Sequence, residues 1–127
     1  MGLEELIFWG KKEDTFDLLG HKITIKLLSS EEDLAASRAA SGYDIFTYDK
    51  IFSHETLIRS LVGVNNRPFK DDQEKRALVA KLQPAICNII LEKYKALRDL
   101  QLVDLDIKRR ELKEITDTPF LEDSSNS

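Results

Sequence analysis

The hydrophobic positions of this chain change their period along the sequence, and each change predicts a different element. Phe16 and Leu18, then Ile23 and Ile25, alternate with polar residues on either side of Gly20. An apolar period of two around a glycine is typical of a β-hairpin. Because two strands alone are marginally stable, we expect one face of this hairpin to pack on helices.

Helical patterns follow the hairpin. Ser29 with Glu32 three residues later is a capping-box pattern and predicts the start of a helix that ends at Gly42. Apolar residues at helical spacing over residues 51–62 predict a second helix, with Gly63 as its end.

The last helical pattern is the longest. Asp71 or Asp72 is expected to cap a third helix, which breaks near Gln83 because Pro84 follows. A proline is well suited to the first position of a helix, so a long helix is predicted from Pro84 to about Ile115. One apolar stripe on it comprises Ile86, Ile90, Tyr94 and Leu97, and a shifted stripe comprises Leu102, Leu105 and Leu112.

Together these elements predict a mainly α chain with a small N-terminal hairpin at about residues 15–28, which is an α+β class with three to four helices. A chain of 127 residues suits one domain, which we place at residues 1–115. Residues 116–127 form an acidic, Ser-rich tail that we expect to be disordered. The segment LVDLDIK (residues 102–108) also alternates with period two, which leaves a strand there as an alternative.

Charge and hydropathy exclude two classes of partner. The net charge is −4, of which Asp117, Glu122 and Asp123 contribute −3, leaving −1 for residues 1–115. A nearly neutral body gives no electrostatic basis for binding nucleic acid. No run reaches the roughly 18 apolar residues of a membrane-spanning helix, and the first residues lack the basic region of a secretion signal. We therefore expect a cytoplasmic protein.

The candidates for chemistry are few. Cys87 lies in the first turn after Pro84, where a helix N-terminus would favour the thiolate, but its apolar neighbours favour burial as a small hydrophobic residue. His21 and His54 are the only histidines and lack the spacing of a zinc site. There is no phosphate-binding glycine loop and no hydrolase motif. The sequence therefore predicts no catalytic residue, no cofactor and no metal.

With no catalytic residue predicted, the feature that can carry a function is the apolar surface of the long helix. A helix of about 30 residues is roughly 45 Å long, and its apolar stripe exceeds what one small core covers. Docking on another chain is a natural use of such a stripe. The candidate partner-binding residues are Ile86, Ile90, Tyr94 and Leu97, with a second patch of Leu3, Phe8 and Trp9 on a short amphipathic turn. Packing inside the chain's own core is the alternative for the same residues.

Several segments resemble a known group of proteins. The hairpin LLGHKITIKLL runs directly into the capped acidic helix start SSEED, and LIRSLVGVNNRPF follows as an apolar helix that ends in a short strand or turn. In LQPAICNIILEKYKAL, Pro84, Ile90 or Leu91, Tyr94 and Leu97 fill a recurring helix pattern. Over about residues 15–100 the chain is similar to the bacteriophage tail assembly chaperones and the related small baseplate-hub assembly proteins of contractile phages.

The resemblance implies a binding protein without catalytic residues. Its expected partners are other phage tail proteins (the tape measure before the tail tube polymerises, the tube, or the baseplate hub) and further copies of itself. It would act in the host cytoplasm, or in the virion tail if its role is structural. Two alternatives stay open: a structural baseplate or tail-completion component of the virion, and a small cytoplasmic regulatory adaptor unrelated to phage.

Overall fold

The computed structural model describes residues 3–116, and these fall into two compact units. The core unit is Lys11–Arg98. The terminal unit combines Met1–Gly10 with Asp99–Ser127, of which the structure describes 3–10 and 99–116. One domain over residues 1–115 stays a prediction from the sequence. The predicted tail, apart from Thr116, lies outside the described residues.

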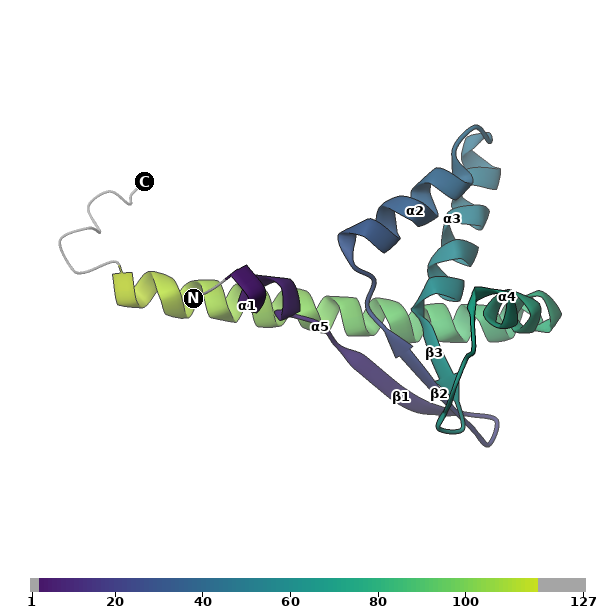
Figure 1. Cartoon of the computed structure of the whole chain (residues 1–127). Helices are drawn as coiled ribbons and strands as arrows, with labels where there is room; N and C mark the ends of the chain where they lie inside the picture. The colour runs from purple at the N-terminus through teal and green to yellow at the C-terminus, as the bar shows by residue number, and fades with distance from the viewer. Residues whose placement is uncertain (1–2, 117–127) are drawn as a thin grey trace. The chain divides into compact units, whose positions relative to one another are not determined.

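An antiparallel sheet with the strand order β1-β2-β3-β4 lies in the core unit (Figure 1). Its strands are β1 (Glu13–Leu18), β2 (His21–Lys26), β3 (Leu61–Val64) and β4 (Arg67–Pro68). The first two strands are the predicted hairpin, and its turn is Leu19-Gly20, with φ angles of 52° and 87°. Two successive positive φ angles match the primed hairpin turns, whose twist suits the flanking strands.

Helices make up most of the chain. The described residues contain α1 (Leu3–Phe8), α2 (Ser30–Ala40), α3 (Ile45–Ser60), α4 (Asp72–Lys81) and α5 (Pro84–Thr116). The chain is 65% helical, which confirms the mainly α prediction with a small hairpin and a long C-terminal helix. The predicted number of helices was wrong: residues 3–116 form five, because the predicted amphipathic turn forms α1. The strand alternative for residues 102–108 is also wrong, since this segment is helical.

The predicted helix starts are confirmed in atomic detail. The Oγ of Ser29 accepts a hydrogen bond from the Glu32 amide at 3.2 Å, and the Glu32 carboxylate accepts one from the Ser29 amide at 2.9 Å. Asp71 is the N-cap of α4. Pro84 is the first residue of α5, where its missing N–H leaves no intrahelical bond unmade.

The predicted end of the second helix at Gly63 was wrong. The helix α3 ends at Ser60, and Leu61–Val64 pair with β2 as strand β3. Burial alternates along these four residues, which is the period of a strand. Asn65 and Asn66 then turn the chain into β4 with φ angles of 54° and 66°. So short an alternating run cannot be told from the end of an apolar helix by its period alone.

One cluster of apolar side chains holds the core unit together. It consists of Ile23, Ile25, Leu57, Ile58, Leu61, Val79, Ile90, Tyr94 and Leu97. Every element of this unit except β1, β4 and α2 therefore supplies at least one of these residues. The hydroxyl oxygen of Tyr94 also accepts a hydrogen bond from the Leu28 amide at 3.3 Å, just after β2. One face of the sheet is thus covered by α3 and α5, as expected for the hairpin.

Gly63 is expected to tolerate no side chain. A Cβ at this position would lie 2.6 Å from the carbonyl oxygen of Arg67 and 3.1 Å from the Cα of Pro68. Both are backbone atoms of the adjoining strand β4, so the sheet would have to shift to remove this steric clash. We expect Gly63→Ala to lower the free energy of unfolding by about 1–3 kcal/mol, measured by urea denaturation followed by circular dichroism. An unchanged urea midpoint would contradict this packing.

Candidate interaction surfaces

The structure places most of the predicted partner-binding stripe inside the core unit. Ile90 is 2% exposed, and Tyr94 and Leu97 are also buried. Ile86 is partly buried and packs against the same cluster. Intrachain packing, the alternative that the sequence left open, accounts for these four side chains in this structure. No partner is needed to cover them.

The second predicted patch lies in the terminal unit and is largely open to solvent. Leu3 is 77% exposed, and its neighbours Leu6 and Ile7 are exposed as well. Trp9 is half-buried. The side chain of Phe8 lies outside the described residues. Leu3, Leu6 and Ile7 are called the α1 patch below.

The terminal helix segment, residues 99–113 of α5, is the larger exposed apolar surface. Its exposed large side chains are Leu100, Leu102, Val103, Leu105, Ile107 and Leu112. The sequence predicted the stripe of Leu102, Leu105 and Leu112 but missed Leu100, Val103 and Ile107. The spacing of these three, i, i+3 and i+7, is a helical signal that could have revealed them.

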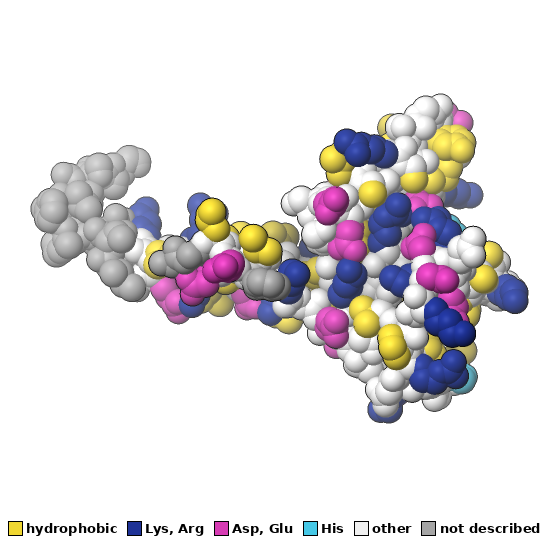
Figure 2. Space-filling view, viewed as in Figure 1, with side chains coloured by type: hydrophobic (Ala, Val, Ile, Leu, Met, Phe, Trp, Pro, Cys, Tyr) yellow, Lys and Arg dark blue, Asp and Glu magenta, His cyan; other side chains and the backbone are white. Residues whose placement is uncertain are grey.

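No described side chain of the terminal unit is fully buried. Figure 2 shows hydrophobic side chains at its surface, interspersed with acidic and basic ones. A soluble chain seldom exposes so many large aliphatic side chains together unless another surface covers them. The terminal unit is therefore the best candidate for an interaction surface.

A hydrogen bond joins the two parts of the terminal unit. The side-chain amide of Gln101 donates to the carbonyl oxygen of Gly10 at 2.6 Å. Leu105 and Leu112 follow Gln101 by four and eleven residues, so they share its side of the helix. The chain that follows α1 thus meets the same side of α5 that carries these two leucines.

A groove in the core unit brings Cys87 and His54 together. It has a volume of about 720 Å³ and is lined by residues of α3, α4 and α5 and the α4–α5 connection. Burial raises the pKa of the Cys87 thiol, which keeps it protonated and poorly nucleophilic. The apolar environment of Cys87 thus outweighs its place in the first turn of α5. Among the described residues, no group of three or more His, Cys, Asp and Glu could hold a metal ion.

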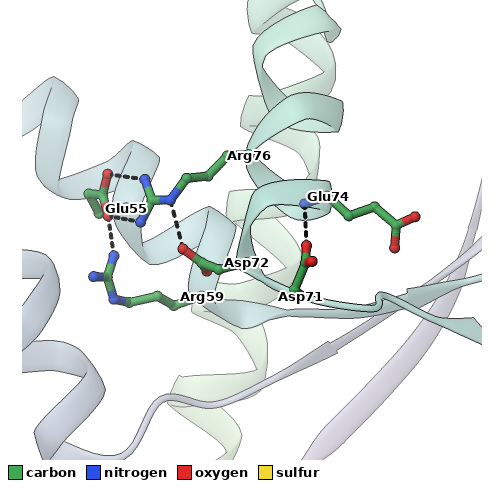
Figure 3. Close-up of polar contacts among 6 residues, drawn as sticks. All are labelled: Glu55, Arg59, Asp71, Asp72, Glu74 and Arg76. Carbon is green, nitrogen blue, oxygen red and sulfur yellow. Dashed lines mark hydrogen bonds and ion pairs between the residues drawn. The ribbon is translucent and has the colours of Figure 1, made fainter.

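An ionic network fixes the α4 wall of this groove (Figure 3). Glu55 of α3 is only 9% exposed and accepts two hydrogen bonds from the Arg76 guanidinium of α4, at 2.8 and 2.9 Å. Arg59 donates to the same carboxylate, and Asp72 accepts from the Nε of Arg76 at 2.7 Å. The bonds from Arg76, with those from Arg59, lower the pKa of Glu55 to about 2. The network therefore ties α4 to α3.

Comparison of the chain with protein-family models, with curated proteins and with solved structures gives no match. Within residues 3–116, no helix combines the length and the apolar character that crossing a bilayer requires. The function must therefore be argued from the surfaces themselves.

The Glu55 network predicts a specific dependence of stability on pH. Because the folded pKa of Glu55, about 2, lies below the ordinary value of 4.5, the stabilisation is complete above about pH 4.5 and is lost as the pH falls toward 2. At pH 7 we expect Glu55→Gln to be less stable than the wild type by about 1–3 kcal/mol. This difference should narrow between pH 4.5 and 3, measured by urea denaturation at several pH values.

The matched control for this pH series is Glu31→Gln, which changes an exposed acid of α2 outside the network. Its stability should follow that of the wild type across the series. A Glu55→Gln deficit of the same size at every pH would contradict an ionised Glu55 in the folded state.

The burial of Ile90 predicts a structural effect of its truncation. Ile90→Ala should destabilise the chain by about 2–5 kcal/mol, because a cavity replaces the lost side chain. Ile45→Ala removes the same atoms from a side chain that is 71% exposed, and should change stability by less than about 0.5 kcal/mol. Thermal denaturation of both variants measures the contrast. Equal effects would place Ile90 outside the core.

Proposed function

We propose that this chain is a non-enzymatic phage tail morphogenesis protein that binds the tape measure or other tail proteins through apolar helical surfaces during assembly. The observation that carries the proposal is the terminal unit, whose large aliphatic side chains are exposed. The similarity of residues 15–100 to tail assembly chaperones supplies the class of partner. The raised pKa of the Cys87 thiol favours binding over catalysis.

The binding surface we assign is the α1 patch with Leu102, Leu105 and Leu112. Covering one such side chain contributes about 1.5–3 kcal/mol when burial is complete. Association and side-chain ordering oppose this gain. A few half-exposed leucines therefore suit reversible binding, in which the chain covers apolar helical stripes of the tape measure until tube subunits replace it.

The test is capture of tail proteins from a phage-infected lysate by the tagged full chain, with mass spectrometry of the eluate and of purified particles. We expect tape-measure protein in the eluate and this chain to be absent from particles. Fixed copies in the particles would replace the chaperone role with that of a structural baseplate component. Cellular proteins alone in the eluate would overturn the phage assignment in favour of a regulatory adaptor.

Two leucine variants locate the binding surface. Leu102→Asp places a charge in the assigned surface and should reduce capture of tape-measure protein about tenfold or more. Leu34→Asp is the matched control in α2 of the core unit, since the two leucines are 55% and 51% exposed. Equal capture by both variants would contradict the assignment of the terminal unit.

A further inference from the structure

Strand β1 is an open edge of the sheet in the core unit. It is the first strand in the order β1-β2-β3-β4, and within residues 3–116 no other strand pairs with its outer side (Figure 1). The opposite edge is β4, which has only two residues and includes Pro68. A short strand and a proline are common means of blocking strand addition at an edge. The six residues of β1 contain no proline, and their pairing with β2 runs without a bulge.

The register of the hairpin shows which backbone groups face the open side. The residues that flank the two-residue turn form a hydrogen-bonded pair, and such pairs alternate with non-bonded ones along an antiparallel ladder. The hydrogen bond from the Leu27 amide to the Lys12 carbonyl, at 3.1 Å, agrees with this alternation. The amides and carbonyls of Glu13, Thr15 and Asp17 therefore point away from β2, to the open edge. All three residues are exposed to solvent.

The side chains along this edge are acidic. Glu13 and Asp17 lie on the exposed side of β1, and Asp14 is partly buried. Among the described residues, no ion pair holds Glu13 or Asp14. Lys26 lies opposite Glu13 on β2 but is bound to Glu32 at 2.7 Å. The carboxylate of Glu13 is therefore available to a cation on an added strand.

The other nearby lysines leave this acidic character in place. Lys22 approaches Asp17 to 4.0 Å, and the two side chains are 58% and 75% exposed, so the pair contributes little by itself. Lys11 and Lys12 precede the strand and have other partners in the chain. The exposed side of β1 therefore favours a partner strand that carries cations.

The core-facing side of β1 sets the other half of the partner's pattern. Phe16 and Leu18 pack against the core cluster and are partly buried. Lys93 of α5 lies over the Phe16 ring, 5.5 Å from its centre, so an apolar neighbour fits this side better than a second cation. Successive side chains of a strand point to opposite faces. We propose that the open edge of β1 binds an extended segment of another protein in which basic and apolar residues alternate.

A second copy of β1 fits this edge poorly. It would place three further acids beside Glu13, Asp14 and Asp17, and like charges on neighbouring strands are destabilising. Backbone hydrogen bonds supply affinity for any extended chain, whereas cross-strand charge pairs select the basic one. The same acids thus oppose self-association at the edge and define the partner. The inference uses none of the residues assigned to the proposed function, so it does not depend on it.

Two synthetic peptides test the pairing with the full chain, by NMR titration of the isotope-labelled protein. The peptide acetyl-TKVTVKT-amide can set lysines opposite Glu13 and Asp17, whereas acetyl-TEVTVET-amide replaces both lysines by glutamate. We expect the lysine peptide to bind with a dissociation constant below about 1 mM, and the glutamate peptide to bind about tenfold more weakly or worse. The amide signals of Glu13, Thr15 and Asp17 should shift most. A lysine peptide that binds no better than the glutamate peptide, or that shifts only signals outside β1 and β2, would overturn the inference.

A matched pair of variants tests the backbone contact. Thr15→Pro removes an amide that points to the open edge, whereas Thr15→Val keeps it. Both variants lose the hydrogen bond between the hydroxyls of Thr15 and Thr24, at 2.8 Å, so they differ mainly in the backbone donor. Thr15→Pro should weaken binding of the lysine peptide about tenfold, and Thr15→Val should leave it within about twofold of the wild type. Equal binding by the two variants would contradict strand addition.

Neutralising the edge tests the charge pattern without removing a backbone group. Glu13→Gln combined with Asp17→Asn should bind the two peptides with affinities within about threefold of each other, because the selective charges are gone. A preference for the lysine peptide as large as that of the wild type would overturn the role assigned to these acids. Circular dichroism checks that each variant is folded. If Thr15→Pro loses its fold, the neutralised variant and the two peptides still decide the inference.

Discussion

The packing of one face of α5 against β2 and α3 is the constraint on which the core unit depends. Ile90, Tyr94 and Leu97 recur at helical spacing and meet the inward-facing side chains of β2. Without this helix, the apolar face of a small antiparallel sheet would stand in water, and isolated hairpins are marginally stable. The Tyr94 hydroxyl adds a polar contact to the chain leaving β2. Two contacts therefore fix the chain where it enters α2: the hydrogen bond to Tyr94 of α5 and the N-cap at Ser29.

The ionic network around Glu55 supplies what apolar packing does not. Val79 is the one fully buried residue of α4, so this helix gains little from the core cluster. Arg76 adds to the attachment of α4 by donating two hydrogen bonds to the Glu55 carboxylate. A carboxylate this buried is stable in its charged form only while its cationic partners are in place. The position of α4, and with it the wall of the Cys87 groove, thus depends on one arginine as much as on hydrophobic contact.

Local features of this fold could be predicted from the sequence, whereas distant pairings could not. The capping box at Ser29, the helix start at Pro84 and the first hairpin depend on residues within a few positions of one another. Strand β3 depends on a partner about forty residues earlier, which no local period reveals. The contact between Glu55 and Arg76 likewise spans 21 residues and has no sequence signature. Contacts between distant parts of the chain therefore determine both features, and local sequence preferences do not.

The two halves of α5 show what an apolar period can and cannot predict. In both halves, aliphatic residues recur at helical spacing, so the period predicts in each case that some surface will cover a face. It does not say which surface. The sheet and α3 cover the face that carries Ile90, whereas the described part of the terminal unit offers only the six-residue α1 besides its part of α5. One short helix cannot cover two faces of another, so part of the apolar surface of residues 99–113 stays exposed.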